Sequence, residues 1–212
     1  MTPYDRPRTR GVASALAVVV MALAFVACSE DKKAPTTTAP PGFEVMSDAK
    51  EGFALAVPAD WTSIPLTEKV NDFNKTANDL RLKNPKLASI LNQARLLGQS
   101  GGKFMAVNPE GASSVNLTVD KPKEKTLDEI VRNSVAGLTN VQATNIKQEP
   151  ATLDGKPSVK VTFRLPVETD AGVVQTDEIQ HYLLAHKKAY ILSLLAAPPN
   201  VAETVASTFR LR

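Results

Sequence analysis

Cysteine, histidine and tryptophan are scarce in this chain. Its 212 residues include one cysteine, Cys28, one tryptophan and two histidines. A lone cysteine cannot form a disulfide within the chain, which excludes a disulfide framework. His181 and His186 lie five residues apart on a predicted strand, so they face opposite sides and cannot chelate one metal ion. We therefore expect neither a metal site nor a cofactor.

An excess of positive charge is also lacking once the first 27 residues are set aside. Residues 1–27 hold three of the 25 basic and one of the 22 acidic side chains, which leaves a net charge of +1. Binding to nucleic acid requires a basic face or stripe that replaces the counterions at phosphates. The composition gives no reason to expect such a face, so nucleic acid is not an expected partner.

The amino-terminal segment has the layout of a secretory signal. Arg6, Arg8 and Arg10 precede a stretch, residues 11–27, that contains no charged side chain. A basic segment followed by an apolar stretch directs export, and this stretch falls just short of the usual length of a membrane-spanning helix. We expect residues 1–27 to be a signal peptide that is removed.

The apolar stretch ends in the sequence Phe-Val-Ala-Cys at residues 25–28, and a polar run begins directly after it. This motif resembles the lipobox of bacterial lipoproteins, in which a small residue precedes a cysteine. We expect cleavage between Ala27 and Cys28 and acylation of Cys28. Each buried methylene contributes about 0.8 kcal/mol, so two acyl chains form a practically irreversible anchor. The predicted location is the extracytoplasmic face of the cell membrane, with the lipid bilayer as a partner; an inert thiol or an uncleaved membrane helix are the alternatives.

A linker and one domain are expected after the cysteine. Residues 34–42 are rich in proline and threonine and offer few apolar side chains to a core, which predicts an extended segment. We therefore assign residues 28–42 to the lipidated cysteine and linker. The remaining residues, 43–212, are enough for one domain with its own core.

Apolar spacing in this domain predicts both strands and helices. Residues 53–57 read as a strand that Pro58 ends, and residues 67–97 read as two amphipathic helices, the second capped by Asn84 with Pro85 at its first position. Strands are predicted at 103–107 and 114–119, and Thr126 with Glu129 forms a capping box that starts a further helix.

Hairpins dominate the remainder of the predicted domain. Asp154-Gly155 is a hairpin turn, residues 173–185 and 189–196 form a longer hairpin, and Asn200 with Glu203 is expected to cap a final helix. Strands that are joined by hairpins pair antiparallel. The predicted fold class is therefore α+β, an antiparallel β-sheet covered by helices.

The order of these elements resembles the PsbP-like fold. The resemblance rests on Pro58-Ala59-Asp60-Trp61 after the first strand, on Tyr190 in the last long strand and on Ser207-Thr208-Phe209-Arg210 after it. With its lipobox and linker, the chain is similar to the LpqN/LpqT lipoproteins of mycobacteria and other actinobacteria. The resemblance covers residues 43–212 and implies an extracytoplasmic α-β-α sandwich. It supplies no catalytic residues.

A hydrolase is one alternative, because residues 98–102 match the motif Gly-x-Ser-x-Gly. Ser100 would be the nucleophile, with Asp177 and His181 as later members of the set. The motif functions when a strand precedes the serine and a helix follows it, whereas here a helix precedes and a strand follows. Asp177 and Glu178 also face opposite sides of a strand, so they do not form a carboxylate pair. We expect no enzyme activity.

Two further features have both a structural and a ligand-binding interpretation. Trp61 is more typical of a core residue than of a ligand groove. The helices of residues 67–97 are expected to cover the sheet, but a gap beneath them would make the protein a lipid or glycolipid carrier.

The sequence as a whole favours a non-enzymatic binding or accessory module of the cell envelope. Its predicted partners are exported proteins or envelope glycolipids, and lipid carriage and hydrolysis are the alternatives. The strand face that carries Lys160, Thr162 and Arg164 is the first candidate contact surface, provided that the helices leave it uncovered.

Overall fold

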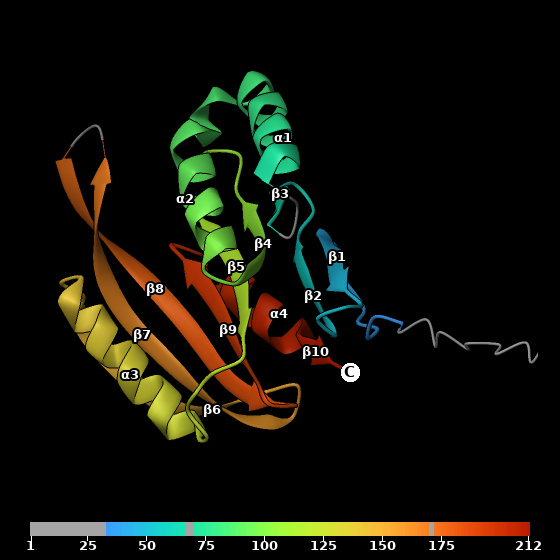
Figure 1. Cartoon of the computed structure of the whole chain (residues 1–212). Coiled ribbons are helices and arrows are strands. Elements are labelled where there is room, and N and C mark those ends of the chain that lie inside the picture. Colours follow the sequence, from blue (N-terminus) through green and yellow to red (C-terminus); the bar gives the residue numbers. More distant parts are fainter. Residues whose placement is uncertain (1–32, 67–69, 170–171) are drawn as a thin grey trace, which may run out of the picture. The chain divides into compact units, whose positions relative to one another are not determined.

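The computed structural model of the chain describes residues 33–66, 70–169 and 172–212 (Figure 1). The predicted signal peptide, its cleavage position at Ala27 and the predicted lipidation site at Cys28 lie outside these ranges. Within the described part of the chain, no helix is both long enough and apolar enough to cross a membrane.

The described residues form two antiparallel β-sheets and four α-helices, which confirms the predicted α+β class. The strands are β1 (Phe43–Asp48), β2 (Phe53–Pro58), β3 (Thr62–Pro65), β4 (Gly102–Val107), β5 (Ser114–Asp120), β6 (Thr144–Leu153), β7 (Lys156–Thr169), β8 (Gly172–Ala185), β9 (Lys188–Leu195) and β10 (Arg210–Leu211). The helices are α1 (Val70–Lys83), η1 (Pro85–Leu87, a 3-10 helix), α2 (Ala88–Gln99), α3 (Leu127–Asn140) and α4 (Pro199–Thr208).

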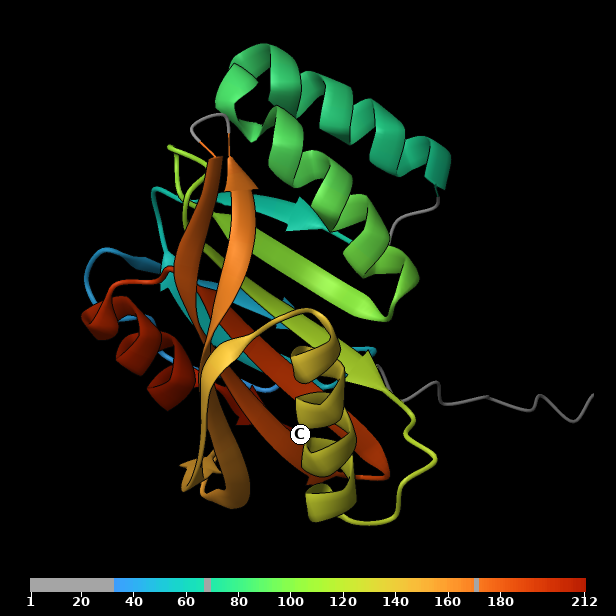
Figure 2. The same ribbon diagram turned by 90° about the vertical axis from the view of Figure 1, so that its left-hand side faces the viewer.

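A seven-stranded sheet in the order β3-β4-β5-β9-β8-β7-β6 forms the centre of the molecule. Helices α2 and α3 cover one of its faces, with α1 packed beside α2, and helix α4 covers the other (Figure 2). The second sheet, in the order β1-β2-β10, lies on the α4 side. The prediction of a single sheet covered by helices was therefore incomplete, because one face is covered by a helix and a small sheet together.

Strand β2 explains why the second sheet exists. All six of its residues are buried, since it is the middle strand of the small sheet and also packs on the large one. Phe53 stacks on Phe104 of β4 with ring centroids 5.9 Å apart, and Trp61 is 8% exposed in the same core. The interpretation of Trp61 as a core residue is confirmed.

The cores of the two faces differ in continuity. On the α4 side one large cluster joins β2 and α4 to strands β4, β5, β8 and β9. On the other side, one cluster lies under α1 and α2, and a separate cluster lies under α3. Val161 and Phe163 belong to the α3 cluster, as the predicted alternation of β7 requires.

The predicted helix starts were correct at two positions and wrong at one. Asn84 accepts a hydrogen bond from the amide of Lys86, and the capping box of Thr126 and Glu129 is complete. The prediction that Asn200 caps the last helix was wrong, because α4 already begins at Pro199 and has no side-chain cap. Proline fits the first helical position because it lacks the amide that would need a partner there.

Candidate functional site

The Gly-x-Ser-x-Gly motif forms the end of helix α2. Ser100 is the C-cap residue, and its hydroxyl donates a hydrogen bond to the carbonyl of Leu96 at 3.0 Å. The backbone conformation explains why glycine occupies positions 101 and 102. Gly101 has a φ of +93°, and a Cβ at Gly102 would lie 2.7 Å from the carbonyl oxygen of Leu97. The motif is thus explained by a helix end and a close backbone approach.

Strand β8 carries the other sequence candidates on two different faces. Asp177 and His181 face the α4 side, whereas Glu178 faces the side of α2 and α3. Asp177 accepts a hydrogen bond from Arg164 Nε at 2.8 Å and is exposed. Ser100 lines a groove on the same face as Glu178, whereas Asp177 and His181 lie on the other face. The structure therefore does not bring Ser100 together with Asp177 and His181.

An open cleft of about 910 Å³ lies between α4 and strand β8, and we call it the α4 cleft. Lys160, Asp177 and His181 line its sheet side, so Lys160 is the one residue of the candidate contact surface that lines this cleft. Ala202 and Ala206 line its helix side, where their small side chains leave room. At the edge of the cleft, Ala196 has a φ of +48°, which is unfavourable for an alanine. Two hydrogen bonds hold this conformation: Ala196 N donates to Asp177 O, and the Ser113 hydroxyl donates to Ala196 O.

His181 is the most unusual side chain of the α4 cleft. It is 8% exposed, and its Nδ1 has no hydrogen-bond partner among the described residues. Burial, and to a smaller extent the charge of Lys160, lowers the pKa of His181 to about 4. The imidazole is therefore neutral at pH 7. His186, by contrast, is exposed in the β8–β9 turn, as expected.

A strip of polar side chains crosses the opposite face of the sheet, between the α1–α2 cluster and the α3 cluster. Strand pairing aligns Asn116 with Ser193 and Ser193 with Gln180 in one row. In the next row it aligns Ser114 with Leu195 and Leu195 with Glu178. We call Ser114, Asn116, Glu178, Gln180 and Ser193 the polar strip.

Three members of the polar strip, Ser114, Glu178 and Ser193, are less than 9% exposed. Burial raises the pKa of Glu178, although a hydrogen bond from Gln180 Nε2 at 2.7 Å acts against this rise. Tyr182 in turn donates to Gln180 Oε1. No Lys or Arg side chain in the described ranges pairs with Glu178, and the hydroxyl of Ser114 has no partner there either. The strip therefore holds unused hydrogen-bonding capacity in a largely desolvated place.

An open groove of about 540 Å³ lies over the polar strip, and we call it the α2 groove. One wall is α2, with Leu96 and Leu97, and the other is β7, with Leu165, Pro166 and Val167. Leu96 is 55% exposed, which is unusual for a leucine that borders a groove. The gap foreseen beneath residues 67–97 is filled by side chains over β3 and β4, and the α2 groove opens beside this packed region.

The polar strip was missed from the sequence, although a signal was present. In β5 the residues Val115, Leu117 and Val119 alternate with Ser114, Asn116 and Thr118, and both sets point to covered faces. An alternating strand is normally interpreted as having one side in solvent. Only the position of β5 inside a seven-stranded sheet shows that its polar side is covered as well.

Metal ligands are not clustered in the part of the molecule that the structure describes. Within it, no three His, Cys, Asp or Glu side chains lie close enough together to hold an ion. Both clefts therefore offer hydrogen bonds and apolar contact as their chemistry.

Comparison with known proteins gives similarity of structure but not of sequence. No protein-family model matches the chain, and no curated protein matches it. The solution structure of cyanobacterial PsbP (CyanoP) from Synechocystis sp. PCC 6803 is similar with a TM-score of 0.53 and 15% identity, over 85% of this chain and 98% of that one.

A second solved structure is less similar. LpqN, which is involved in cell envelope biogenesis of Mycobacterium tuberculosis, has a TM-score of 0.42 and 12% identity, over 83% of this chain and 89% of that one. The similarity to CyanoP shows that the chain has the PsbP-like fold.

Proposed function

We propose that the protein is a membrane-anchored lipoprotein of the extracytoplasmic side that acts as a non-enzymatic binding module of the cell envelope. The observation that carries the binding role is the polar strip beneath the α2 groove. Buried polar groups are normally satisfied, and groups that lack a partner gain most from a ligand that supplies one. The anchor rests on the sequence around Cys28.

The groove also indicates a class of ligand. Three members of the polar strip line its floor, namely the carboxyl group of Glu178, the amide of Asn116 and the hydroxyl of Ser114, and its walls are largely apolar. A molecule with several hydroxyl groups and an apolar portion would match both, as an envelope glycolipid does. Lipid carriage in the same groove is the second candidate, and the exposed Leu96 at its rim favours it.

The anchor is tested by replacing Cys28 with alanine in a bacterium that processes lipoproteins. Because the chain has no other thiol, the variant has no cysteine to acylate. We expect metabolic labelling with a palmitate analogue in the wild type and no label in the variant. A variant that still takes up label would refute acylation at Cys28.

The groove is tested with octyl glucoside, used below its micellar concentration as a sugar with an apolar chain. Leu96→Glu places a charge at the groove rim, and Leu82→Glu is the matched control, since Leu82 is 80% exposed on α1 and does not line the groove. In isothermal titration of the mature chain we expect at least about tenfold weaker binding for Leu96→Glu only, the factor that 1.4 kcal/mol represents.

Glucose and octanol are measured alongside octyl glucoside. Binding of all three probes with equal affinity, or equal weakening by the two leucine variants, would contradict the groove as a site for an amphiphilic ligand. If octanol alone reproduces the affinity of octyl glucoside, the groove serves apolar carriage and the polar strip makes no contribution to recognition.

A further inference from the structure

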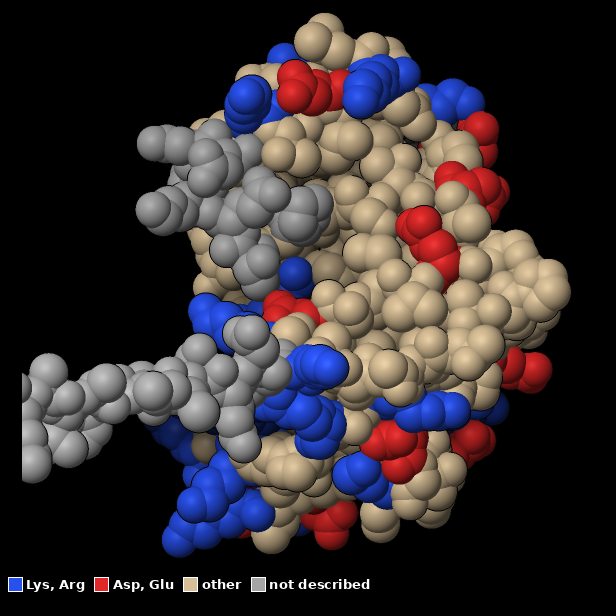
Figure 3. Space-filling view, turned by 90° about the vertical axis from the view of Figure 1, so that its right-hand side faces the viewer, with Lys and Arg blue, Asp and Glu red and all other residues tan. Residues whose placement is uncertain are grey.

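Four exposed lysines gather on two neighbouring loops at one end of the molecule. Lys121, Lys123 and Lys125 lie between β5 and α3, and Lys187 lies in the β8–β9 turn. A hollow of about 360 Å³ is lined by both loops, which places them side by side. We call these four residues the lysine surface. Lys and Arg side chains are also seen to gather on the lower part of the face in Figure 3.

The charges of the lysine surface are not neutralised by ion pairs. None of the four ammonium groups forms a salt bridge within residues 33–66, 70–169 and 172–212. The loop carboxylate of Glu124 accepts a hydrogen bond from Asn133. At the ends of the loop, Asp120 and Glu129 accept hydrogen bonds from the backbone amides of Lys121 and Lys125. Lys188, by comparison, pairs with Glu51 at 2.8 Å. The surface thus differs from the neighbouring lysines, which have partners.

The turn that presents Lys187 is strained. His186 and Lys187 have φ values of +52° and +59°, and they form the two-residue loop between the paired residues Ala185 and Lys188. Turns of this kind favour Asn-Gly or Asp-Gly, and the β6–β7 turn uses Asp154-Gly155. Strain of this kind is retained where a side chain has a role. The chain therefore places a lysine where glycine would be more stable.

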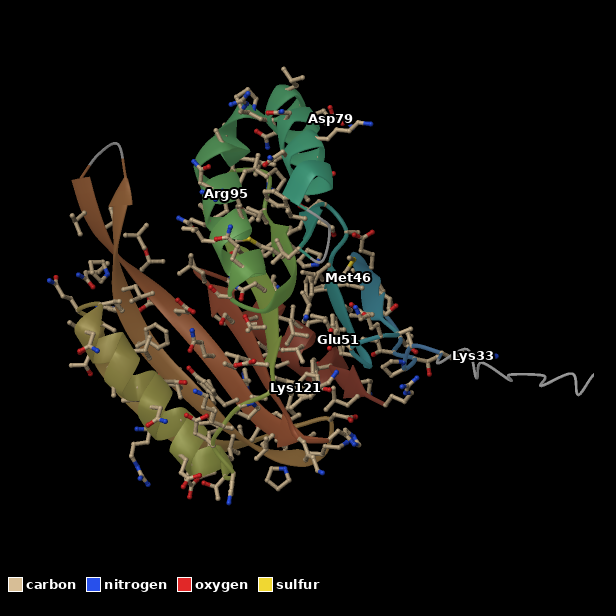
Figure 4. The ribbon with its side chains drawn as sticks, in the orientation of Figure 1. Lys33, Met46, Glu51, Asp79, Arg95 and Lys121 are labelled. Carbon is tan, nitrogen blue, oxygen red and sulfur yellow. The ribbon has the colours of Figure 1, made fainter. Side chains whose placement is uncertain are left out.

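A series of contacts links the lysine surface to the point where the described chain begins. Arg212 Nη1 donates a hydrogen bond to the carbonyl of Lys33, and the Arg212 amide donates to Gly52. The adjacent Glu51 binds Lys188, which follows Lys187 directly. Lys33, Glu51 and Lys121 are labelled in Figure 4, where the positions of these residues can be compared. These contacts connect the first described residue to the β8–β9 turn.

The length of chain before Lys33 limits its distance from an anchor. Four residues lie between Cys28 and Lys33, and an extended chain spans at most about 3.5 Å per residue step, which is roughly 18 Å over the five steps. A lipid on Cys28 would therefore hold this end of the domain near the headgroups. Within that reach the domain can approach the headgroups to about one Debye length, the range over which a lysine interacts with an anionic membrane surface.

We propose that the lysine surface docks onto the anionic phospholipid headgroups of the membrane that anchors the protein, which rests on the proposed acylation of Cys28. The acyl chains supply affinity and the lysine surface supplies orientation. Helices α1 and α2 lie at the opposite end of the domain from the β5–α3 loop (Figures 1 and 2). Docking would therefore direct the α1–α2 end away from the bilayer.

Lysine footprinting on vesicles tests the orientation. The mature chain is coupled through its only thiol, Cys28, to a maleimide lipid in vesicles of phosphatidylcholine, with or without phosphatidylglycerol. The coupled protein is then acetylated with an uncharged amine-reactive ester, and each lysine is followed by mass spectrometry. We expect the lysine surface to react about fivefold more slowly on the anionic vesicles. Lys75 and Lys83 on α1 should react equally on both.

Charge reversal in the exposed loops completes the test without disturbing the core. Lys123→Glu with Lys187→Glu should abolish the protection, and the control Lys75→Glu with Lys83→Glu should preserve it. Equal rates on the two kinds of vesicle, or protection that persists after the loop reversal, would overturn docking. Because the tether is chemical, such a failure would not affect the proposed acylation, which palmitate labelling tests separately.

Discussion

The two faces of the central sheet are built in different ways. On the α4 face a single apolar cluster extends from the small sheet across most of the large one. On the other face two smaller clusters are separated by the polar strip. A continuous core provides stability to the whole domain, whereas a divided face leaves a row of polar groups that add little stability. The continuous core therefore lies on the α4 face, and the ligand site that we propose lies on the divided face.

Strand β8 shows the same contrast in two residues. His181 faces the α4 side and Glu178 faces the polar strip, and both are 8% exposed. Burial is the main cause of the pKa change in each, lowering the pKa of His181 and raising that of Glu178, so both are driven toward the neutral form. Glu178 is held by Gln180, whereas the Nδ1 of His181 has no partner among the described residues.

The largest expected effect compares the cores of the two faces. Phe209 is fully buried on the α4 side and packs edge-on against Tyr190, so Phe209→Ala should lower the free energy of unfolding by about 3–5 kcal/mol. Ile90→Ala, in the α1–α2 cluster, should mainly raise local opening of those helices. Urea unfolding and amide hydrogen exchange measure the two effects. Equal global destabilisation by both variants would remove the distinction between the faces.

The second effect concerns His181 and pH. Because its folded pKa, about 4, lies below the ordinary value of 6.5, its contribution to stability is complete above pH 6.5 and is lost as the pH falls through 4. The loss should amount to about 2–3 kcal/mol, an order-of-magnitude figure. Carbon-detected NMR titration of the imidazole gives the pKa, and urea unfolding of His181→Leu should lack this part of the pH dependence. A measured pKa near 6.5 for His181 would contradict the burial of its side chain.

The sequence predicted local structure well and the assignment of faces poorly. Caps at Asn84 and Thr126, the Asp154-Gly155 turn and the alternation of β7 depend on neighbouring residues, and all four were correct. Three edge strands were missed, because β1, β3 and β10 are short and lie at sheet margins, where the alternation of apolar residues is weak. The polar strip joins β5 to the β8–β9 hairpin, which is distant from it in sequence, so it depends on strand order, which no local pattern encodes.

The smallest expected effect concerns Glu178 and its neighbour Asp177 on opposite sides of one strand. The folded pKa of Glu178 is raised, so its contribution to stability is present below the unfolded value of 4.5 and is lost as the pH rises through the folded pKa. Above the folded pKa the buried carboxylate is charged and has no cation partner among the described residues, which destabilises the protein.

Glu178→Gln should therefore raise the free energy of unfolding at pH 8 by an amount on the order of 1 kcal/mol, while at pH 4 the variant should give little or no gain. Asp177→Asn is the control, because its exposed pair with Arg164 should contribute less than about 1 kcal/mol at either pH. Urea unfolding at both pH values measures the two variants. A Glu178→Gln protein that is less stable at pH 8 would mean that the carboxylate has a stabilising partner. In that case the polar strip of the divided face would be explained by a contribution to the stability of the fold and not by ligand binding.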